Sequence, residues 1–356
     1  MTNATSSFAQ LAEEQLRPDV RRIDQEGYYP APFLRALGAA DAYCVLTGRP
    51  EGVAEAIDVT SEIGRHCGST AFLLWCHYTC IWYVTMTDNA SLRERYLEDL
   101  TTGRILGGTA LSNPIKHYSG LEDLYLKARR VSNGYIVNGA LPWVSNLGIG
   151  HLFGAIIDAG EERIAALIRI DGEKVRLGSS GKFSALEGTA TYSLRCDDAF
   201  ISDDDLLGRP AEPFVDKVRP GFLLLQAGIG FGIVRGILDD IARSNHKLRE
   251  INRFIDLQPE AIAEELASLE AEVHRLCETP LDPSPSYQRK VFEARLAVAD
   301  FTHRASYSGI QHAGAPGFLA NAHPQRRVRE ALFVTLVTPS VKQLRKILNT
   351  EGLHKK

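Results

Sequence analysis

The sequence predicts a mainly α-helical protein with a central β domain. Apolar residues recur at helical spacing over the first hundred positions, strand-like alternation begins at Gly107, and helical spacing returns at Gly221. We therefore expect an N-terminal helical domain over residues 1–106, a small β-barrel or β-sandwich over 107–208, and a C-terminal four-helix bundle over 209–356.

The N-terminal domain is predicted to contain four main helices. Their apolar patterns cover residues 34–46, 53–67, 70–86 and 91–103. The 70–86 run is apolar on every side, so we expect it at the centre of its bundle. It is the only membrane candidate that the pattern indicates, but it is short and contains a histidine, which favours a core helix.

Turn residues divide the predicted β domain. Ser132-Asn-Gly134 is typical of a hairpin turn, and Asn138-Gly139 predicts a second turn shortly after it. Further strand-like runs cover residues 152–158, 163–170 and 189–201.

The C-terminal domain begins with a proline-rich stretch. Three prolines in 210–220 predict a connector, and three helices are expected at 221–245, 260–278 and 287–310. The first of these contains Gly228, Gly230, Gly232 and Gly236. No strand precedes these glycines, so close helix packing is favoured over a dinucleotide-binding loop.

Composition excludes several classes of protein. The 356 residues carry a formal net charge of −4, so the chain has no overall positive charge that would attract nucleic acid or anionic lipid. The first residues, 1–7, lack the basic and apolar regions of a signal peptide. The six cysteines are scattered, which favours reduced thiols in the cytoplasm, and we expect no metal site.

Four short motifs follow one another along the chain. They are Gly108-Thr-Ala-Leu-Ser-Asn-Pro114, then Gly134-Tyr-Ile-Val-Asn-Gly139 with Trp143-Val-Ser-Asn146, then Cys196-Asp-Asp-Ala-Phe-Ile with Asp205-Leu-Leu-Gly208, and finally Gln311-His-Ala-Gly-Ala-Pro-Gly-Phe318 with Arg327-Val-Arg-Glu330. In this order, over roughly residues 25–345, they resemble the acyl-CoA dehydrogenase-like flavoprotein superfamily, including its flavin-dependent monooxygenase branch. The resemblance implies the same helical, β and helical order of domains.

The resemblance also implies a flavin, FAD with FMN as an alternative. By position in the motifs, backbone groups of Ala110 and Leu111 lie beside the flavin ring, Ser112 approaches its polar edge, and Trp143 and Ser145 flank it. Such a ring needs an apolar face for stacking and a few hydrogen-bond donors. The alternative for Trp143 is a strand aromatic packed in the core.

The C-terminal turn implies a homodimer or a homotetramer. Gln311, Gly314 and Gly317 match the turn that, in this family, holds the adenosine end of a neighbouring subunit's flavin. Ala315 replaces one glycine of that turn, and Arg253 is the nearest match to the arginine that grips the pyrophosphate.

One catalytic group of the family is missing. Counting forward from Glu330, Thr338 occupies the place of the glutamate that removes the substrate α-proton in acyl-CoA dehydrogenases. A threonine hydroxyl is a poor base near pH 7. The candidate catalytic residues are therefore Thr338, Ser112 and His77. The last resembles an oxygenase histidine near the substrate, or is a core histidine bonded to a backbone carbonyl.

Three functions remain open. The first is an oxygenase that uses reduced flavin and O2 on a small organic or thioester-linked substrate, with a separate flavin reductase as an expected partner. The second is an acyl-CoA dehydrogenase with a displaced base, for which Asp216 and His77 are candidates. The third is a redox-silent scaffold subunit.

Overall fold

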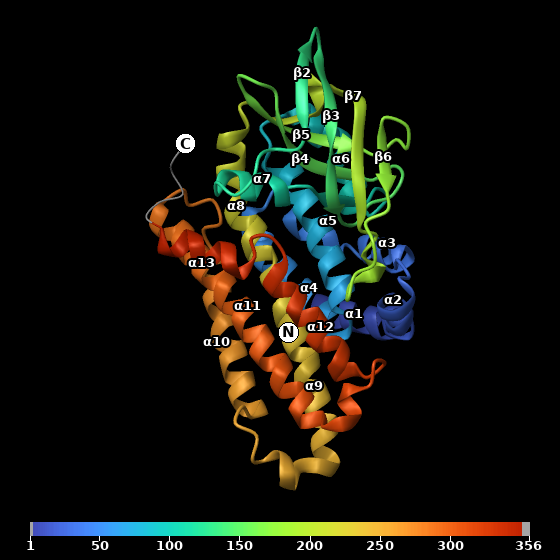
Figure 1. Cartoon of the computed structure of the whole chain (residues 1–356), viewed down its shortest axis with the longest axis vertical. Coiled ribbons are helices and arrows are strands. Elements are labelled where there is room, and N and C mark those ends of the chain that lie inside the picture. Colours follow the sequence, from blue (N-terminus) through green and yellow to red (C-terminus); the bar gives the residue numbers. More distant parts are fainter. Residues whose placement is uncertain (1–2, 351–356) are drawn as a thin grey trace.

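Strands gather at one end of the molecule, and the long C-terminal helices extend to the other end (Figure 1). The computed structural model describes residues 3–350; Met1 and Thr2, within the stretch tested for a signal peptide, lie outside the described residues. Helices precede and follow a block of strands that runs from Gly107 to Gly208. The predicted fold class, mainly α with a central β domain, is confirmed.

Six α-helices precede the strands. They are α1 (Asn3–Leu11), α2 (Val20–Glu26), α3 (Ala31–Ala39), α4 (Val53–His66), α5 (Gly68–Met86) and α6 (Ala90–Thr101). Every residue of α5 is buried, as expected of a helix that is apolar all round. The helix predicted over 34–46 is wrong in one respect: Asp41 adopts a left-handed conformation (φ 60°), so α3 ends and a short 3-10 turn, Ala42–Leu46, follows.

The strands form one mixed sheet. They are β1 (Gly107–Thr109), β2 (Lys127–Val131), β3 (Gly134–Val144), β4 (Leu152–Asp158), β5 (Arg163–Arg169), β6 (Val175–Gly178), β7 (Tyr192–Ser202) and β8 (Leu206–Gly208). Their order is β6-β7-β3-β2-β4-β5-β8, and β1 pairs in parallel with β4. A short helix, α7 (Ser112–Tyr118), leaves the sheet after β1. The sheet has its own apolar core, separate from the core of the helices.

One of the two predicted turns in this region is wrong. The hairpin turn at Ser132-Asn-Gly134 joins β2 to β3 as expected. Asn138-Gly139 instead lies inside β3, where the register against β7 shifts between Val137 and Gly139. Gly139 has φ 137°, and a Cβ there would lie 2.2 Å from the Tyr125 carbonyl oxygen, so this glycine forms a bulge rather than a turn.

The helices after the strands form the bundle. They are α8 (Ala211–Leu225), α9 (Ala227–Asn252), α10 (Pro259–Cys277), α11 (Pro285–Ala313), α12 (His323–Leu336) and α13 (Val341–Asn349). The connector predicted at 210–220 is wrong because α8 occupies it. Pro213 lies in the first turn of α8, where a missing N–H costs little, and the helix accommodates Pro220 in its interior. A single residue, Gln226, separates α8 from α9.

The glycines of α9 serve close packing, as the sequence indicates. A Cβ on Gly232 would lie 2.6 Å from the Cα of Gly64, so only glycines allow α9 to cross α4 at this distance. Among the described helices, the run Ala211–Asn252, and not 70–86, is long and apolar enough to cross a membrane. Of its most apolar stretch, 89% is buried inside the protein, which is typical of a core helix.

Candidate functional site

A cleft of about 320 Å³ lies where the two helical regions meet the strands. Its apolar lining comes mainly from α5, α8, α12 and the loop before β7, and it consists of Phe72, Trp75, Cys76, Trp143, Phe183, Ala185, Leu186, Phe222, Phe333, Leu336 and Val337. Its polar lining consists of hydroxyl groups and one amine: Thr109, Ser112, Ser145, Thr189, Thr191, Thr338 and Lys116. None of these lining residues carries a carboxylate or an imidazole.

Ser112 and Thr338 face each other in this cleft. Ser112 begins α7, and Thr338 follows the end of α12, yet their hydroxyl oxygens are 2.6 Å apart. Either hydroxyl can donate this hydrogen bond, which leaves the other free to donate to a ligand. The structure thus brings together two of the three predicted catalytic residues.

A second group of hydroxyls surrounds Ser145. Its Oγ lies 2.6 Å from Oγ1 of Thr191, which lies 2.8 Å from Oγ1 of Thr189. Thr189 in turn donates to the Leu186 carbonyl. The sequence analysis missed both threonines, because the run 189–201 was interpreted as strand and no residue pattern shows that the preceding loop turns into the cleft.

Asn146 holds this edge of the cleft in place. Its backbone is left-handed (φ 61°), its Nδ2 donates to the Gly107 carbonyl oxygen at 2.7 Å, and its Oδ1 accepts from the Tyr29 hydroxyl at 2.6 Å. Gly108 packs so closely that a Cβ would lie 2.4 Å from the Ser145 carbonyl oxygen. These contacts explain why the motifs around Gly108 and Trp143 occur together.

Trp143 lies at the rim of the cleft and not in the core. Its side chain is 60% exposed, and its indole N–H points to the Ser180 carbonyl oxygen at 3.4 Å. The alternative of a packed core aromatic is therefore wrong. An exposed indole face beside a cleft is a surface on which a planar ligand can stack.

The backbone groups predicted to contact a ligand are already engaged. The Ala110 N–H donates to the Gly154 carbonyl oxygen at 2.9 Å, as an extension of the β1–β4 pairing. The Leu111 N–H donates to Oγ1 of Thr109 at 3.3 Å. Neither residue is among the lining residues, although Thr109 and Ser112 on either side are; that their backbone groups lie beside a flavin ring stays a prediction.

His77 is a core histidine. Its Nε2 lies 2.9 Å from the Leu100 carbonyl oxygen, and its Nδ1 accepts from the Gly107 N–H at 3.0 Å. Burial lowers the pKa of His77 to about 3, so the ring is neutral. With both nitrogens engaged and no exposed surface, His77 cannot exchange protons with the cleft, and its predicted catalytic role is wrong.

Cys76, next to His77, does line the cleft. Burial raises the pKa of its thiol well above the ordinary value, so the sulfur stays protonated and is a poor nucleophile. All six cysteines are free thiols.

The four residues predicted to hold an adenosine end lie away from this cleft. Arg253 caps α9, and Gln311, Gly314 and Gly317 lie where α11 ends. The two helix ends are adjacent, since Nδ2 of Asn252 donates to the His312 carbonyl. In Figure 1 these ends are at the opposite end of the molecule from the sheet. One chain therefore does not bring them to the Ser112 cleft.

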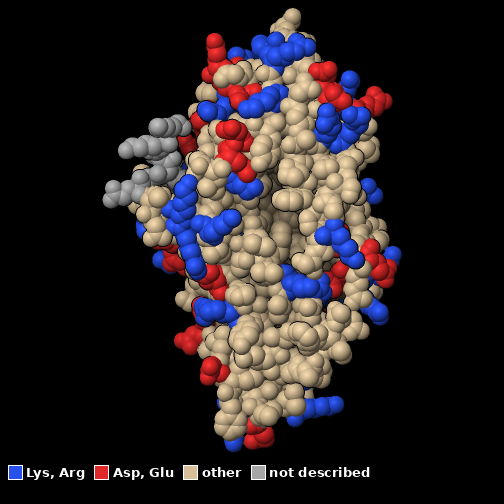
Figure 2. Space-filling view, viewed as in Figure 1, with Lys and Arg blue, Asp and Glu red and all other residues tan. Residues whose placement is uncertain are grey.

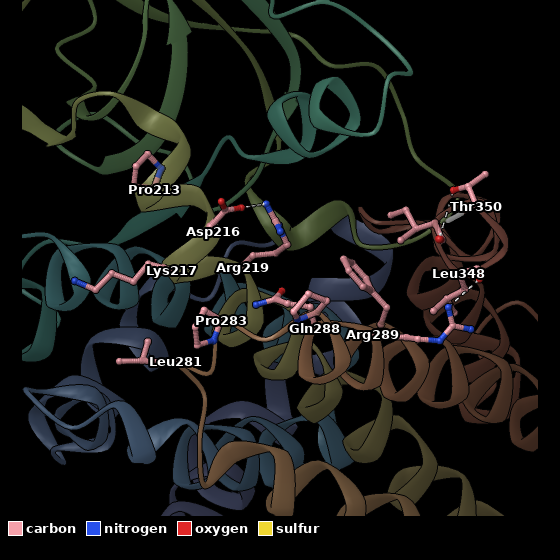
Figure 3. A pocket seen from close by; sticks show the side chains of 13 residues that line it. Pro213, Asp216, Lys217, Arg219, Leu281, Pro283, Gln288, Arg289, Leu348 and Thr350 are labelled. Atoms are coloured by element: carbon pink, nitrogen blue, oxygen red, sulfur yellow. Dashed lines mark hydrogen bonds and ion pairs between the residues drawn. The ribbon is translucent and has the colours of Figure 1, made fainter. Parts of the chain in front are cut away.

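Asp216, the other candidate for a displaced base, lines a different cavity. This cavity, of about 510 Å³, lies between α8, α11 and α13, and Figure 3 shows Asp216 directed toward Arg219, with which it forms an ion pair. Both residues also border a larger cavity of about 1,100 Å³ beside α7. The carboxylate is thus held by a cation and does not reach the Ser112 cleft.

Comparisons with known proteins place the helical, β and helical fold and its cleft beside the acyl-CoA dehydrogenases. Residues 3–104 match the family "Acyl-CoA dehydrogenase, N-terminal domain". Over 96% of its length the chain is 21% identical to the benzylmalonyl-CoA dehydrogenase of Aromatoleum aromaticum, of which it covers 94%.

Solved structures with the same fold include both a dehydrogenase and a monooxygenase. The butyryl-CoA dehydrogenase from Megasphaera elsdenii superposes with a TM-score of 0.81 at 17% identity, covering 98% of this chain and 97% of that chain. The dibenzothiophene monooxygenase TdsC from Paenibacillus sp. A11-2 also gives 0.81, at 18% identity, covering 97% and 95%. A further structure of TdsC is described as FMN-bound. The predicted resemblance is confirmed: residues 3–104 match the acyl-CoA dehydrogenase N-terminal family, and the whole chain has the fold of these neighbours.

Proposed function

We propose that the chain is a flavin-dependent oxidoreductase that binds the flavin ring in the Ser112 cleft and acts as an oxygenase with reduced flavin and O2. The observation that carries the proposal is the Ser112–Thr338 hydrogen bond of 2.6 Å in a cleft whose lining has no carboxylate and no imidazole. A bound flavin would supply the two-electron chemistry, and the chain's residues would orient it and exclude water.

The donors and apolar surfaces of the cleft fit a flavin ring. The volume of about 320 Å³ is within the roughly 300–1,000 Å³ usual for ligand pockets. Trp143 offers an exposed aromatic face on one side, and Ser112 and Ser145 offer hydroxyls at its edges. The relatives are dehydrogenases and a neighbour of the same fold is FMN-bound, which supports FAD or FMN here.

The absence of a carboxylate and an imidazole among the lining residues favours oxygenase chemistry. The one amine of the lining, that of Lys116, lies 3.4 Å from a carboxylate oxygen of Glu122. Removal of an α-proton from an acyl thioester needs a positioned base. Thr338 is instead committed to a neutral hydrogen bond, the imidazole of His77 is sealed in the core, and Asp216 is paired with Arg219. Reaction of reduced flavin with O2 needs no such base, only an enclosed cleft with hydrogen-bond donors.

The proposal includes a small organic or thioester-linked compound as the substrate and a separate flavin reductase as a partner. An acyl-CoA dehydrogenase with a displaced base is the second candidate, because the relatives are dehydrogenases. The visible spectrum of the purified protein, with and without added FAD and FMN, tests the proposal first. A protein that binds neither flavin would be the redox-silent scaffold and would contradict both candidates.

We expect Trp143→Ala to weaken flavin binding by about 5- to 150-fold, since stacking of a base on an aromatic side chain contributes roughly 1–3 kcal/mol. Titration of the apoprotein with FMN and with FAD measures the dissociation constant. Phe200→Ala is the matched control, because Phe200 is an aromatic of the same sheet that is 50% exposed and does not line the cleft. An unchanged constant for Trp143→Ala would show that the ring binds elsewhere.

The apolar surface at the far end of the bundle supports a homodimer or homotetramer. Phe254 after α9, Tyr307 on α11 and Phe318 after α11 are 74%, 62% and 78% exposed. Figure 2 shows few charged side chains over the lower half of this face, where α9, α11 and α12 lie in Figure 1. Exposed apolar residues of this size are typical of protein interfaces. Gln311, Gly314 and Gly317 would then lie at the interface, in reach of a neighbour's flavin.

Light scattering at micromolar concentration is expected to give the mass of a dimer or a tetramer. Phe318→Arg is expected to lower that mass and to weaken FAD binding more than FMN binding, since FMN lacks the adenosine end. Leu121→Arg, at a residue that is 47% exposed in the loop after α7, is the control. A wild-type monomer that binds FAD tightly would contradict the assembly.

A further inference from the structure

A buried arginine lies behind the cleft without a carboxylate partner. Arg295, on α11, is 3% exposed, and within residues 3–350 no carboxylate pairs with it and its Nη1 has no hydrogen-bond partner. Its Nε donates to Oε1 of Gln226, and its Nη2 donates to the Val334 carbonyl oxygen at 2.7 Å. Burial lowers its pKa to about 10, so the guanidinium is still charged at pH 7. A buried cation without a carboxylate partner is costly, so these two hydrogen bonds are what stabilises the Arg295 charge.

Gln226 connects this arginine to the cleft. It is the single residue between α8 and α9 and is 1% exposed. While its Oε1 accepts from Arg295, its Nε2 donates to the Thr338 carbonyl oxygen at 2.9 Å. One amide thus joins α11 to the segment that follows α12.

Both contacts engage carbonyls that the end of α12 leaves free. The last carbonyls of a helix have no partner within it, and α12 ends at Leu336. Arg295 occupies the Val334 carbonyl, and Gln226 occupies the Thr338 carbonyl just beyond the end. Together they tie the last turn of α12 and the segment just beyond it to α11 and Gln226.

We propose that Arg295 and Gln226 are positioning residues that hold Thr338 where its hydroxyl bonds Ser112. The contacts form one chain, Arg295 to Gln226 to the Thr338 backbone, whose hydroxyl is 2.6 Å from Ser112. A shift of Thr338 by about 1 Å would break this bond, because hydroxyl pairs bond only at about 2.5–3.0 Å. The effect on a ligand rests on the proposed function, whereas the effect on the hydroxyl pair does not.

A double-mutant cycle tests the effect on flavin binding. Thr338→Val and Gln226→Leu are each expected to weaken FMN binding about five- to tenfold, the loss typical of one hydrogen bond. The double variant is expected to bind no more weakly than either single variant, because Gln226 acts through the Thr338 hydroxyl. If the two effects multiply, Gln226 acts by another route and the proposal is wrong.

A second variant and a control guard against misfolding. Gln226→Leu leaves Nε of the buried Arg295 without an acceptor, so Arg295→Met/Gln226→Leu removes both ends of the contact and is tolerated more readily. It is expected to weaken FMN binding to the same extent, and unaltered binding would contradict the proposal. Thr302→Val is the control, since Thr302 is also buried on α11 but bonds only the carbonyl of Val298 in its own helix.

A measurement without flavin separates this inference from the proposed function. Ser112→Ala, Thr338→Val and the double variant make up a double-mutant cycle, in which the urea midpoint of unfolding of the apoprotein is measured. A coupling between the two hydroxyls is expected in the wild type and is expected to vanish in the Gln226→Leu background. A coupling that persists there, or that is absent in the wild type, overturns the inference. If no variant binds flavin, only the proposed function fails.

Discussion

Anaerobic mixing of the flavin-loaded protein with saturated acyl-CoAs is expected to leave the flavin oxidised. The sequence motifs predict Thr338 at the position of the family's base, and no lining residue of its cleft carries a carboxylate or an imidazole. Absence of a positioned base typically costs about 10²–10⁴-fold in rate. Stopped-flow absorbance near the flavin maximum measures the bleaching directly.

Thr338→Glu restores a carboxylate at that position and is expected to raise the bleaching rate with any acyl-CoA that fits, by up to about 10²–10⁴-fold. The native oxygen-dependent reaction is expected to lose activity in this variant, since a carboxylate replaces the neutral partner of Ser112. Thr335→Glu is the matched control: it makes the same chemical change three residues earlier, at a residue that does not line the cleft.

A second stopped-flow experiment mixes the reduced protein with oxygen. Reduced wild-type protein mixed with O2 is expected to transfer oxygen to substrate and to release little hydrogen peroxide, because the enclosed cleft retains the reactive species. Rapid bleaching by acyl-CoAs, with stoichiometric peroxide on reoxidation, would favour the dehydrogenase instead. Asp216→Asn would then test whether the Arg219-paired carboxylate moves to serve as the base.

Replacement of His77 by glutamine is expected to change how stability depends on pH. The pKa of His77 is about 3 in the folded protein, whereas an unfolded histidine titrates near pH 6.5. Below about pH 6.5 the unfolded chain therefore binds a proton that the folded chain does not, and the wild type loses up to about 1.4 kcal/mol per pH unit through this residue. Above pH 7 neither state is protonated and this contribution vanishes.

Two opposite effects on the stability of His77→Gln make the difference from the wild type depend on pH. Near pH 7.5 the variant is expected to be less stable by about 1–3 kcal/mol, because glutamine cannot reproduce both bonds, to the Leu100 carbonyl and from the Gly107 N–H. Near pH 4 the difference is expected to shrink or reverse, since glutamine does not titrate. Urea midpoints at both pH values measure it, and a constant difference would mean that His77 is not sealed in the core.

Much of the fold follows from local pattern. The all-round apolar run at 70–86 can only be stable when surrounded, and the structure buries α5 completely. The glycines of α9 were interpreted correctly as a packing surface, because a phosphate-binding loop needs a preceding strand. The local pattern gave a wrong prediction at 210–220. Its prolines predicted a connector, but they lie in the first turn and in the buried interior of α8.

The sequence motifs grouped four residues that the structure brings to one cleft. Ser112, Trp143, Ser145 and Thr338 all line one cleft, although some 226 positions separate the first from the last. The motifs could not tell which groups were already bonded. The Ala110 N–H is taken by the sheet, and His77 by two backbone groups, because hydrogen-bond partners come from distant segments.

From its sequence alone this chain could be assigned a helical, β and helical order, an acyl-CoA dehydrogenase-like resemblance and a missing glutamate, since each depends on which residues follow one another. Tertiary structure decided what surrounds the position of that glutamate. It enclosed His77, paired Asp216 with Arg219, and connected Thr338 through Gln226 to a buried arginine. Burial and hydrogen bonding depend on groups brought together from far along the chain, so only the folded arrangement could show that the polar lining of the cleft is hydroxyls and one amine, without a carboxylate or an imidazole.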